Sequence, residues 1–311
     1  MSEYSEPKPY LHNIENPVSA PPRRVVSLVP SITESLFDLN VGDRLIAVTD
    51  YCIHPADKVA GLARIGGTKN PDVDTIIAMQ PDLVFANQEE NRREDVERLQ
   101  SAGIPVWVTF PKNMREAFSV LWNIMHIFDA PELVERVRSM EWTLDWLERM
   151  AQRREDDPLP TFVPIWYDPW MTFNADTYAH DVIRVCGGTN IFAERERLYP
   201  LAADLGRGAA YAGDDPRIQG RDTRYPRLTL DEIMAAQPQV ILLPNEPFPF
   251  TQSHADELAA LDIPAARIDP KTGKNRIHLV DGSLITWHGT RMARAMSILP
   301  PLFYPAEDFN D

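Results

Sequence analysis

Short apolar runs and helical spacings of apolar residues alternate along the chain. The runs at 25–29 and 45–48 predict strands, and the segment between them predicts a helix over 32–39. A helix near 92–102 and a strand over 104–110 continue this alternation. Because strands and helices follow one another in this way, we expect a parallel sheet covered by helices, which is an α/β fold.

Two of the expected helix starts carry the capping-box pattern, a Ser or Thr followed three residues later by Glu. Ser31 with Glu34 precedes the helix over 32–39, and Thr229 with Glu232 opens a later helix. In such a box the hydroxyl and the carboxylate each accept a backbone N–H that the helix leaves unpaired. The pattern therefore predicts a helix N-terminus at both places.

One phrase occurs twice, as DTIIAMQPDLVFA at 74–86 and as DEIMAAQPQVILL at 231–243. Both copies begin with Asp, continue with helical spacing of apolar residues, and reach a Gln-Pro pair. Proline cannot continue a helix because it lacks the N–H and its ring collides with the preceding turn. The apolar run that follows is typical of a buried strand. The repeat predicts two similar α/β lobes with a ligand cleft between them.

The segment 131–154 interrupts the alternation, since it has no internal Gly or Pro and mixes apolar with charged residues. It predicts one long helix that bridges the lobes. The second lobe then begins with a strand over 161–166 and a helix over 178–185, which two glycines close. The expected division is an N-terminal arm (1–23), a first lobe (24–129), a bridging helix (130–157) and a second lobe (158–311) with an insertion at 198–227.

That insertion is rich in Gly, Asp and Arg and is too long for an ordinary connection. It is either a functional flap or a disordered segment. Four of its arginines offer guanidinium groups that suit an anionic ligand, and nearby aspartates offer a simpler explanation as solvated charge pairs. The arginines are Arg207, Arg217, Arg221 and Arg224, and the aspartates are Asp214, Asp215 and Asp222.

Composition restricts the partners and the compartment. A net charge of −15 argues against nucleic acid and against anionic membrane surfaces, and no window is apolar enough to span a membrane. The N-terminus has no basic and apolar segments of the kind found in secretory signals. Cys52 and Cys186 stand far apart, which favours free thiols in a reducing compartment. These features predict a cytoplasmic protein.

Several segments together resemble a known family. They are VVSLVPSITE (25–34), GGTKNPDVDTIIAMQPDLVFA (66–86), CGGTNIF (186–192) and TLDEIMAAQPQVILL (229–243). In this order and spacing they are similar to the helical-backbone class of ABC-transporter substrate-binding proteins, most closely its cobalamin-binding branch. The resemblance implies two α/β lobes joined by a rigid interlobe helix. It also implies a non-enzymatic protein that needs no cofactor and holds a small-molecule ligand in the cleft.

The resemblance also implies a ligand site lined by aromatic side chains, which offer flat faces to a corrinoid such as cobalamin or cobinamide. The matching positions are Tyr51, Trp166, Tyr167, Trp170, Phe173, Tyr225, Asp281 and Trp287. The chain departs from the family pattern twice, with Gly67 or Thr68 at one tryptophan position and Asn87 at another. These departures keep a smaller, more polar or metal-chelate ligand open as an alternative.

The family uses one acidic residue on each lobe to dock onto arginines of its membrane transporter. Asp74 and Asp231 match these positions, one in each copy of the repeated phrase. The resemblance therefore implies docking to an ABC importer through this pair. Both residues also stand in the first turn of a helix, where the helix dipole favours an acidic side chain without any partner.

Two other classes of function remain open. His54, His180, His254 and His288 are scattered over both lobes without the close spacing of a strong metal motif, so a metal-ion or siderophore receptor is one alternative. The chain contains no nucleophile elbow, P-loop or dinucleotide fingerprint. A cytosolic enzyme or sensor that has reused the cleft is the other alternative.

Overall fold

The computed structural model describes residues 18, 20–153, 158–270 and 272–304. The described residues form two compact units. Lobe 1 consists of the residues up to Trp142 together with Trp287–Met292, and lobe 2 consists of Thr143–Thr286 together with those from Ala293 onward. Within the described part of the chain, no helix has both the length and the apolar character needed to cross a membrane.

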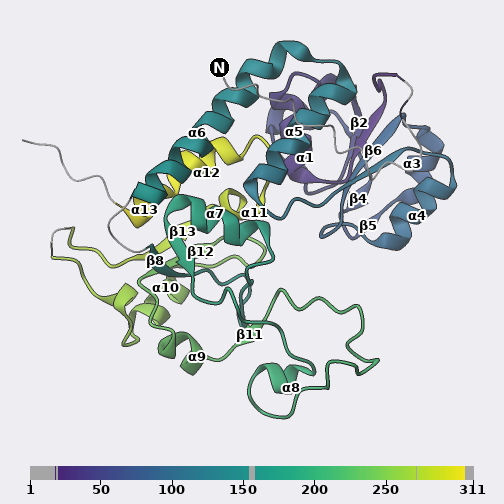
Figure 1. Ribbon diagram of the computed structural model, residues 1–311. Coiled ribbons are helices and arrows are strands. Elements are labelled where there is room, and N and C mark those ends of the chain that lie inside the picture. The colour runs from purple at the N-terminus through teal and green to yellow at the C-terminus, as the bar shows by residue number, and fades with distance from the viewer. Residues whose placement is uncertain (1–17, 19, 154–157, 271, 305–311) are drawn as a thin grey trace, which may run out of the picture. The chain divides into compact units, whose positions relative to one another are not determined.

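Lobe 1 is built on a five-stranded parallel sheet (Figure 1). Its order is β3 (Ala63–Arg64), β2 (Leu45–Val48), β1 (Val25–Ser27), β6 (Leu83–Asn87) and β7 (Val106–Thr109). The central strands β1 and β6 are buried along their whole length, as expected for strands that helices cover on both faces.

Helices cover both faces of this sheet. On one face, α3 (Val73–Met79) and α4 (Arg93–Ser101) contribute apolar residues to a core with alternate residues of the strands. On the other face, Phe128 at the end of α5 (Met114–Phe128) stacks on Phe85 of β6 with ring centroids 6.4 Å apart. The predicted α/β architecture is therefore confirmed for lobe 1.

Lobe 2 repeats the same strand order in a four-stranded parallel sheet. Its strands are β10 (Gly188–Asn190), β8 (Leu159–Phe162), β12 (Val240–Pro244) and β13 (Ile277–Val280). They correspond in order to β2, β1, β6 and β7 of lobe 1, so the repeated phrase does mark two lobes of one design. The expected strand over 161–166 begins and ends earlier, which leaves Trp166 in the loop after β8.

Gly188 shows how closely the helices of lobe 2 approach the sheet. A Cβ atom at this position would lie 2.6 Å from the Phe303 ring and 2.8 Å from Ile183 of α7 (Tyr178–Cys186). On the sheet, α9 (Leu230–Ala235) and α10 (Gln252–Ala259) supply further core residues, among them Ile233 and Leu258.

Apart from the long helix α6 (Val134–Arg153), the remaining helices and strands are short. They are α1 (Pro30–Asp38), α2 (Ala56–Val59), β4 (Gly66–Gly67), β5 (Asn70–Pro71), β9 (Trp170–Met171), α8 (Leu201–Asp204), β11 (Arg227–Leu228), α11 (Ser283–Thr286), α12 (Met292–Ile298) and α13 (Pro300–Phe303), with 3₁₀ turns at Gly42–Arg44, Pro131–Leu133 and Pro264–Ala266.

The Gln-Pro pair ends the repeated helix in the same way in both lobes. Gln80 and Gln237 adopt the left-handed backbone region, with φ of 48° and 50°. A left-handed residue closes a helix by turning the chain out of the helical path, and the following proline keeps the chain from resuming it. The chain then enters β6 in lobe 1 and β12 in lobe 2.

The two predicted capping boxes have different outcomes. The helix α1 begins at Pro30 after Val29, with no side-chain cap, so the box of Ser31 and Glu34 is wrong. In lobe 2, the Thr229 hydroxyl does accept the Glu232 amide at the start of α9. The carboxylate of Glu232 instead accepts from Arg195 at 2.8 Å, so only half of this box forms.

The long helix predicted after residue 130 is α6 (Val134–Arg153), preceded by one 3₁₀ turn. The division between the two units falls inside it, after Trp142. Residues 1–17 of the expected arm and 154–157 of the expected bridging helix lie outside the described residues. The four-part division remains a prediction, and the grouping of Trp287–Met292 with lobe 1 differs from it.

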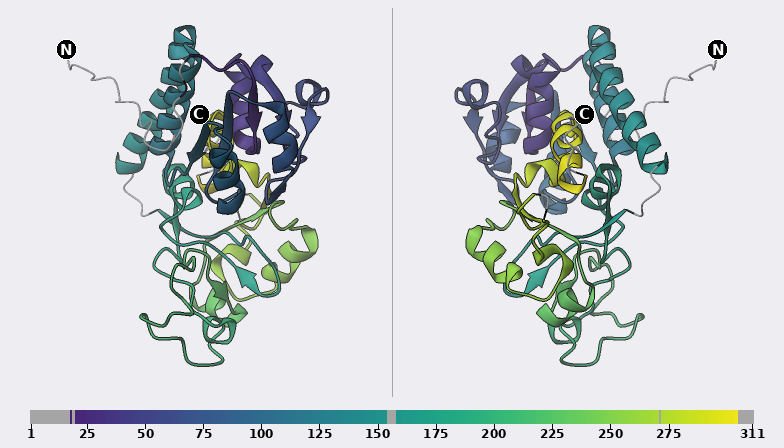
Figure 2. Two further views of the ribbon diagram at one scale, coloured as in Figure 1. Left: turned by 90° about the vertical axis from the view of Figure 1, so that its right-hand side faces the viewer. Right: turned by 90° about the vertical axis from the view of Figure 1, so that its left-hand side faces the viewer.

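The insertion at 198–227 is held to lobe 2 by a buried carboxylate. Asp204 has no exposed side-chain surface and accepts from the guanidinium of Arg195 at 3.0 Å. It also accepts the backbone N–H groups of Leu198 and Arg227, which lie at the two ends of the insertion. The insertion runs as long loops (Figure 2), and its short helix α8 is labelled in Figure 1. Asp204 thus ties its two ends together, as expected for a folded segment.

Candidate functional site

Tyr51 follows strand β2 at the carboxyl edge of the lobe 1 sheet, and 62% of it is exposed. Its ring lies against the β4–β5 hairpin, because a Cβ atom at Gly67 would come within 3.3 Å of it. The backbone N–H of Asp50 donates to Gly66 and holds the two loops together. Gly67, which with Thr68 is one of the two expected matches to a family tryptophan, adds no side chain against the ring and leaves Tyr51 largely exposed.

Trp287 joins the same lobe through the returning segment Trp287–Met292. Its ring lies between the edge of His54, with centroids 6.0 Å apart, and the guanidinium of Arg291, 5.0 Å from the ring centroid. Arg291 is itself fixed by Glu34 of α1 through two hydrogen bonds of 2.6 and 2.7 Å. The half-buried indole is thus held by charged and aromatic neighbours rather than by a hydrophobic core.

Asn87 stands at the end of β6, at the second position where the family has tryptophan. It is 4% exposed, and its side-chain oxygen accepts the backbone N–H groups of Glu89 and Glu90. Its Nδ2 donates to Thr109 at 3.3 Å and lies 3.5 Å from Nε2 of His288. Asn87 therefore shapes the loop after β6, a role that a tryptophan could not fill.

His288 is the most perturbed histidine of lobe 1. Burial lowers its pKa to about 4, so the imidazole is neutral at pH 7. A neutral imidazole can exchange hydrogen bonds with Asn87 but carries no charge for an anionic ligand. From the sequence, His288 is a candidate only as a metal ligand, because no local pattern shows that the returning segment brings it to β6.

In lobe 2, three of the aromatic residues expected in the site do come together. Trp166 is 45% exposed and meets Phe248 edge-on, with centroids 5.6 Å apart. Tyr167 contacts both Trp170 and Phe248, and its hydroxyl donates to Glu257 at 3.0 Å. This bond to a carboxylate raises the pKa of Tyr167. The loop after β8 therefore presents one exposed indole, that of Trp166, which packs on a cluster of aromatic side chains.

This aromatic cluster includes three residues that the sequence analysis does not predict. Phe250 stacks parallel to Trp170 at 5.9 Å, and His254 at the start of α10 meets Tyr167 at 4.8 Å. With Phe248 they come from the loop after β12 and the helix that follows. The available signal was the FPF sequence at 248–250, four residues beyond the second copy of the repeated phrase and in the loop after a predicted strand.

The other expected ligand residues of lobe 2 lie elsewhere. Phe173 is 1% exposed and buried in the fold, and half-buried Tyr225 lies under the guanidinium of Arg224 at 5.2 Å. Asp281 accepts the N–H and hydroxyl of Ser283 at the start of α11. Each of these residues has a structural role, and their contact with ligand stays a prediction.

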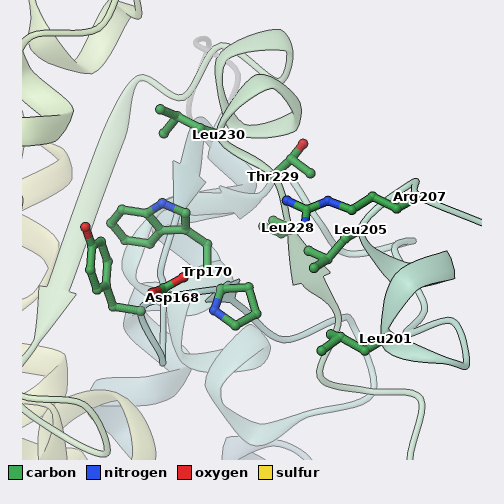
Figure 3. Close-up of a pocket in the computed structure, with 10 residues that line it drawn as sticks. Asp168, Trp170, Leu201, Leu205, Arg207, Leu228, Thr229 and Leu230 are labelled. Atoms are coloured by element: carbon green, nitrogen blue, oxygen red, sulfur yellow. The ribbon is translucent and has the colours of Figure 1, made fainter.

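A pocket of about 410 Å³ opens beside the aromatic loop of lobe 2 (Figure 3). One side is formed by residues 167–170, and other sides are formed by 228–230 and by the insertion residues Leu201, Leu205 and Arg207. Its volume is within the range of small-molecule sites. The insertion therefore takes part in a cavity rather than only extending a loop.

Asp74 and Asp231 occupy equivalent places in the two lobes, the first turns of α3 and α9. Both are exposed. Asp74 accepts from Arg98 of α4 at 2.8 Å, in a pair whose two side chains are both more than half exposed. Exposure at matching positions is what docking requires, and the docking itself stays a prediction.

The four histidines considered as metal ligands do not converge. Among the described residues, no three His, Cys, Asp or Glu side chains are placed to share a metal ion. His254 Nδ1 accepts the backbone N–H of Thr251 and caps α10. Burial lowers the pKa of His180, which lies on α7. Neither Cys52 nor Cys186 forms a disulfide, and both thiols are buried, in different lobes.

Known relatives extend over most of the chain. Vitamin B12-binding proteins of Yersinia pestis and Yersinia pseudotuberculosis are 27% identical over 245 residues, which is 78% of this chain and 74% of theirs. Among solved structures, the periplasmic vitamin B12 binding protein of Vibrio cholerae has a TM-score of 0.67 at 20% identity, covering 91% of this chain and 97% of that one. A periplasmic heme-binding protein from Roseiflexus has a TM-score of 0.66 at 21% identity, covering 91% and 98%.

A family model described as periplasmic binding protein matches residues 25–243. This match shows that the predicted cytoplasmic location is wrong and points to the periplasm. The prediction rested on the composition of the N-terminal residues and on two distant cysteines, and neither feature determines the compartment. The family match also excludes the alternative of a cytosolic enzyme, since the family consists of substrate-binding proteins. The chain belongs to the periplasmic binding protein family and is a non-enzymatic ligand-binding protein with its two-lobed α/β fold.

Proposed function

We propose that this protein binds a corrinoid, cobalamin or cobinamide, or a related metal-chelate ring, as the cargo of an ABC importer. The observation that carries the proposal is the pair of exposed aromatic side chains, Tyr51 and Trp166, each in the loop at the carboxyl edge of its sheet. Curated relatives with the name vitamin B12-binding protein support the same ligand class.

Exposed aromatic rings suit a large flat ligand for a physical reason. An aromatic side chain buries a large area when a ring system covers it, and its face prefers offset stacking. Tyr51 is 62% exposed and lies beside Gly67, while Trp166 is 45% exposed and contacts the Phe248 ring. Each side chain therefore has apolar surface available for a ligand without needing to unfold its loop.

Trp287 is the third residue that we assign to the ligand. His54 and Arg291 hold its indole, so its orientation is set before any ligand arrives. A preorganised side chain loses little conformational entropy on binding. The two lost tryptophans, at Gly67 or Thr68 and at Asn87, make the aromatic surface smaller, so we expect this chain to accept variation in the ligand at the periphery of the ring.

The test is an absorbance titration of the purified protein with cobalamin and cobinamide, repeated for Tyr51→Ala and Trp166→Ala. We expect saturable binding that each substitution weakens about tenfold or more, as for aromatic anchors of other interfaces. Trp142→Ala is the matched control, because Trp142 is 60% exposed but lies on helix α6. Absence of saturable binding to either corrinoid, or equal losses for Trp142→Ala, would refute the assignment.

We propose further that Asp74 and Asp231 dock the protein onto the importer. Support comes from their exposure and from their matching places in α3 and α9. The double charge reversal Asp74→Lys with Asp231→Lys should abolish binding to a reconstituted vitamin B12 importer and leave the corrinoid titration unchanged. Glu97→Lys, at another exposed acid of lobe 1, is the control. Retained importer binding by the double variant would contradict docking through this pair.

A further inference from the structure

The pocket of lobe 2 combines apolar walls with a few polar groups. Trp170, Leu205 and Leu228 line it, and Leu201 presents 46% of its surface at its edge (Figure 3). An exposed leucine next to a cavity gains hydrophobic stabilisation only when another molecule covers it. The walls therefore favour an occupant with a hydrocarbon portion.

The polar groups of the pocket are mainly donors. The Arg207 guanidinium has no ion pair or side-chain hydrogen bond with any described residue. Trp170 is 6% exposed, and its indole N–H likewise has no acceptor in the described part of the chain. The Thr229 oxygen accepts the Glu232 amide, which leaves its own proton to donate. The indole nitrogen is not one of the buried atoms that lack a partner, so it is accessible, and together these donors can meet an acceptor that a ligand brings.

Charge determines how such a ligand would lie. Arg207 is the one cation among the residues that line the pocket, and Asp168 is the one acid. Figure 3 shows Asp168 on the same loop as Trp170, and Arg207 on the insertion. An anionic group would be attracted to Arg207 and repelled by Asp168. Guanidinium binds carboxylate with two parallel hydrogen bonds, which fixes both the position and the orientation of the group.

The part of the insertion that lines the pocket is fixed to the rest of lobe 2. Asp204, at the end of α8, is buried and bonds to Arg195 and to backbone at both ends of the insertion. Leu201 and Leu205 lie on either side of Asp204, on or next to the same short helix, and Arg207 follows two residues later. The groups that face the pocket are therefore held close to a fixed point of the fold.

We infer that this pocket is a second binding site, for a small amphipathic carboxylate whose anionic group meets Arg207 and whose hydrocarbon chain lies along Trp170 and Leu201. A volume of about 410 Å³ is too small for a whole corrinoid. The site lies within lobe 2, and the inference does not depend on the identity of the main ligand.

Octanoate is the probe, with octylammonium and octan-1-ol as probes of the same chain length but different charge. Isothermal titration of the full chain should show octanoate binding that the other two lack. Arg207→Gln should weaken octanoate binding roughly tenfold to a hundredfold, the usual effect of losing a hydrogen bond to a charged group. Arg221→Gln is the control, since Arg221 belongs to the same insertion but its guanidinium lies over Tyr199, 5.0 Å from the ring centroid.

Two further variants separate this site from the corrinoid site. Trp170→Phe keeps an aromatic ring against Phe250 but removes the indole N–H, so we expect a smaller loss of octanoate affinity than for Arg207→Gln. Tyr51→Ala should leave octanoate binding unchanged, whatever its effect on cobalamin. Equal binding of octanoate and octylammonium, or an Arg207→Gln protein that binds octanoate as well as the unaltered chain, would overturn the proposal.

Discussion

Arg291 donates to both carboxylate oxygens of Glu34, although 257 positions separate the two residues in the chain. Both side chains are largely buried, with 2% of Arg291 and 14% of Glu34 exposed. The pair fastens the returning segment Trp287–Met292 to helix α1 of lobe 1, and Thr290 adds a hydrogen bond to Asp38 at 2.7 Å. The ion pair between Arg291 and Glu34 thus fixes the position of the segment that carries Trp287.

Removing one member of this pair should destabilise the protein strongly. Glu34→Ala removes the carboxylate that accepts two hydrogen bonds from the buried Arg291 guanidinium, and breaking such a pair costs about 3–5 kcal/mol. Urea unfolding followed by circular dichroism measures the loss. Arg98→Ala is the matched control, because its pair with Asp74 is exposed and should contribute less than about 1 kcal/mol. A similar loss in the two variants would mean that Glu34 and Arg291 are not held as a buried pair.

Acid should weaken the fold through His288. Its pKa is about 4 in the folded chain and near 6.5 when unfolded, so the unfolded state binds more protons between these values. Stability from this group is therefore complete above pH 6.5 and falls by up to about 3 kcal/mol as the pH drops toward 4. Unfolding free energies measured at pH 7 and pH 4.5 should differ less in His288→Gln than in the unaltered protein. An equal difference in both proteins would exclude His288 as the source.

Asn87 should prove essential to the fold of the loop after β6. Asn87→Ala removes the acceptor of the Glu89 and Glu90 amides and the donor to Thr109, and each buried group left unsatisfied costs about 1–3 kcal/mol. Asn87→Trp, which restores the residue of the family pattern, should be at least as destabilising, because the site is 4% exposed and has no room for an indole. Thermal unfolding of both variants checks this, and a stable Asn87→Trp protein would show that the loop can adopt the family arrangement.

Sequence patterns predict the helices and strands whose ends are determined by interactions between neighbouring residues. The repeated Gln-Pro phrase indicates a helix end and a buried strand because left-handed closure and proline act on neighbouring residues, and both lobes confirm it. The capping box at Ser31 failed for the opposite reason. The Glu34 carboxylate bonds to Arg291 from the far end of the chain, a partner that no local pattern reveals.

The candidate site shows the same difference between residues that local sequence identifies and residues that only the tertiary fold brings together. Trp166 and Tyr167 follow a strand of a parallel sheet, and the rule that ligands bind at the carboxyl edge correctly directs attention to their loop. The partners Phe248, Phe250 and His254 come from another strand and its helix, so their contact with that loop depends on strand order. The pocket beside them requires the fold of the insertion, which has little periodicity to predict.

Asp204 provides a direct test of whether the insertion is folded onto lobe 2. Asp204→Ala removes an acceptor of Arg195 and of two backbone amides from a fully buried position, so Arg195 loses its innermost partner. We expect a loss of stability of about 3–5 kcal/mol, as for other broken buried pairs, and faster proteolysis within 198–227. Asp222→Ala is the control, because Asp222 pairs with Arg224 at the surface with 43% of its side chain exposed. Limited proteolysis followed by mass spectrometry locates the cuts. If Asp204→Ala and Asp222→Ala are cut at the same rate, the insertion is not anchored by Asp204, and the octanoate pocket loses its structural basis.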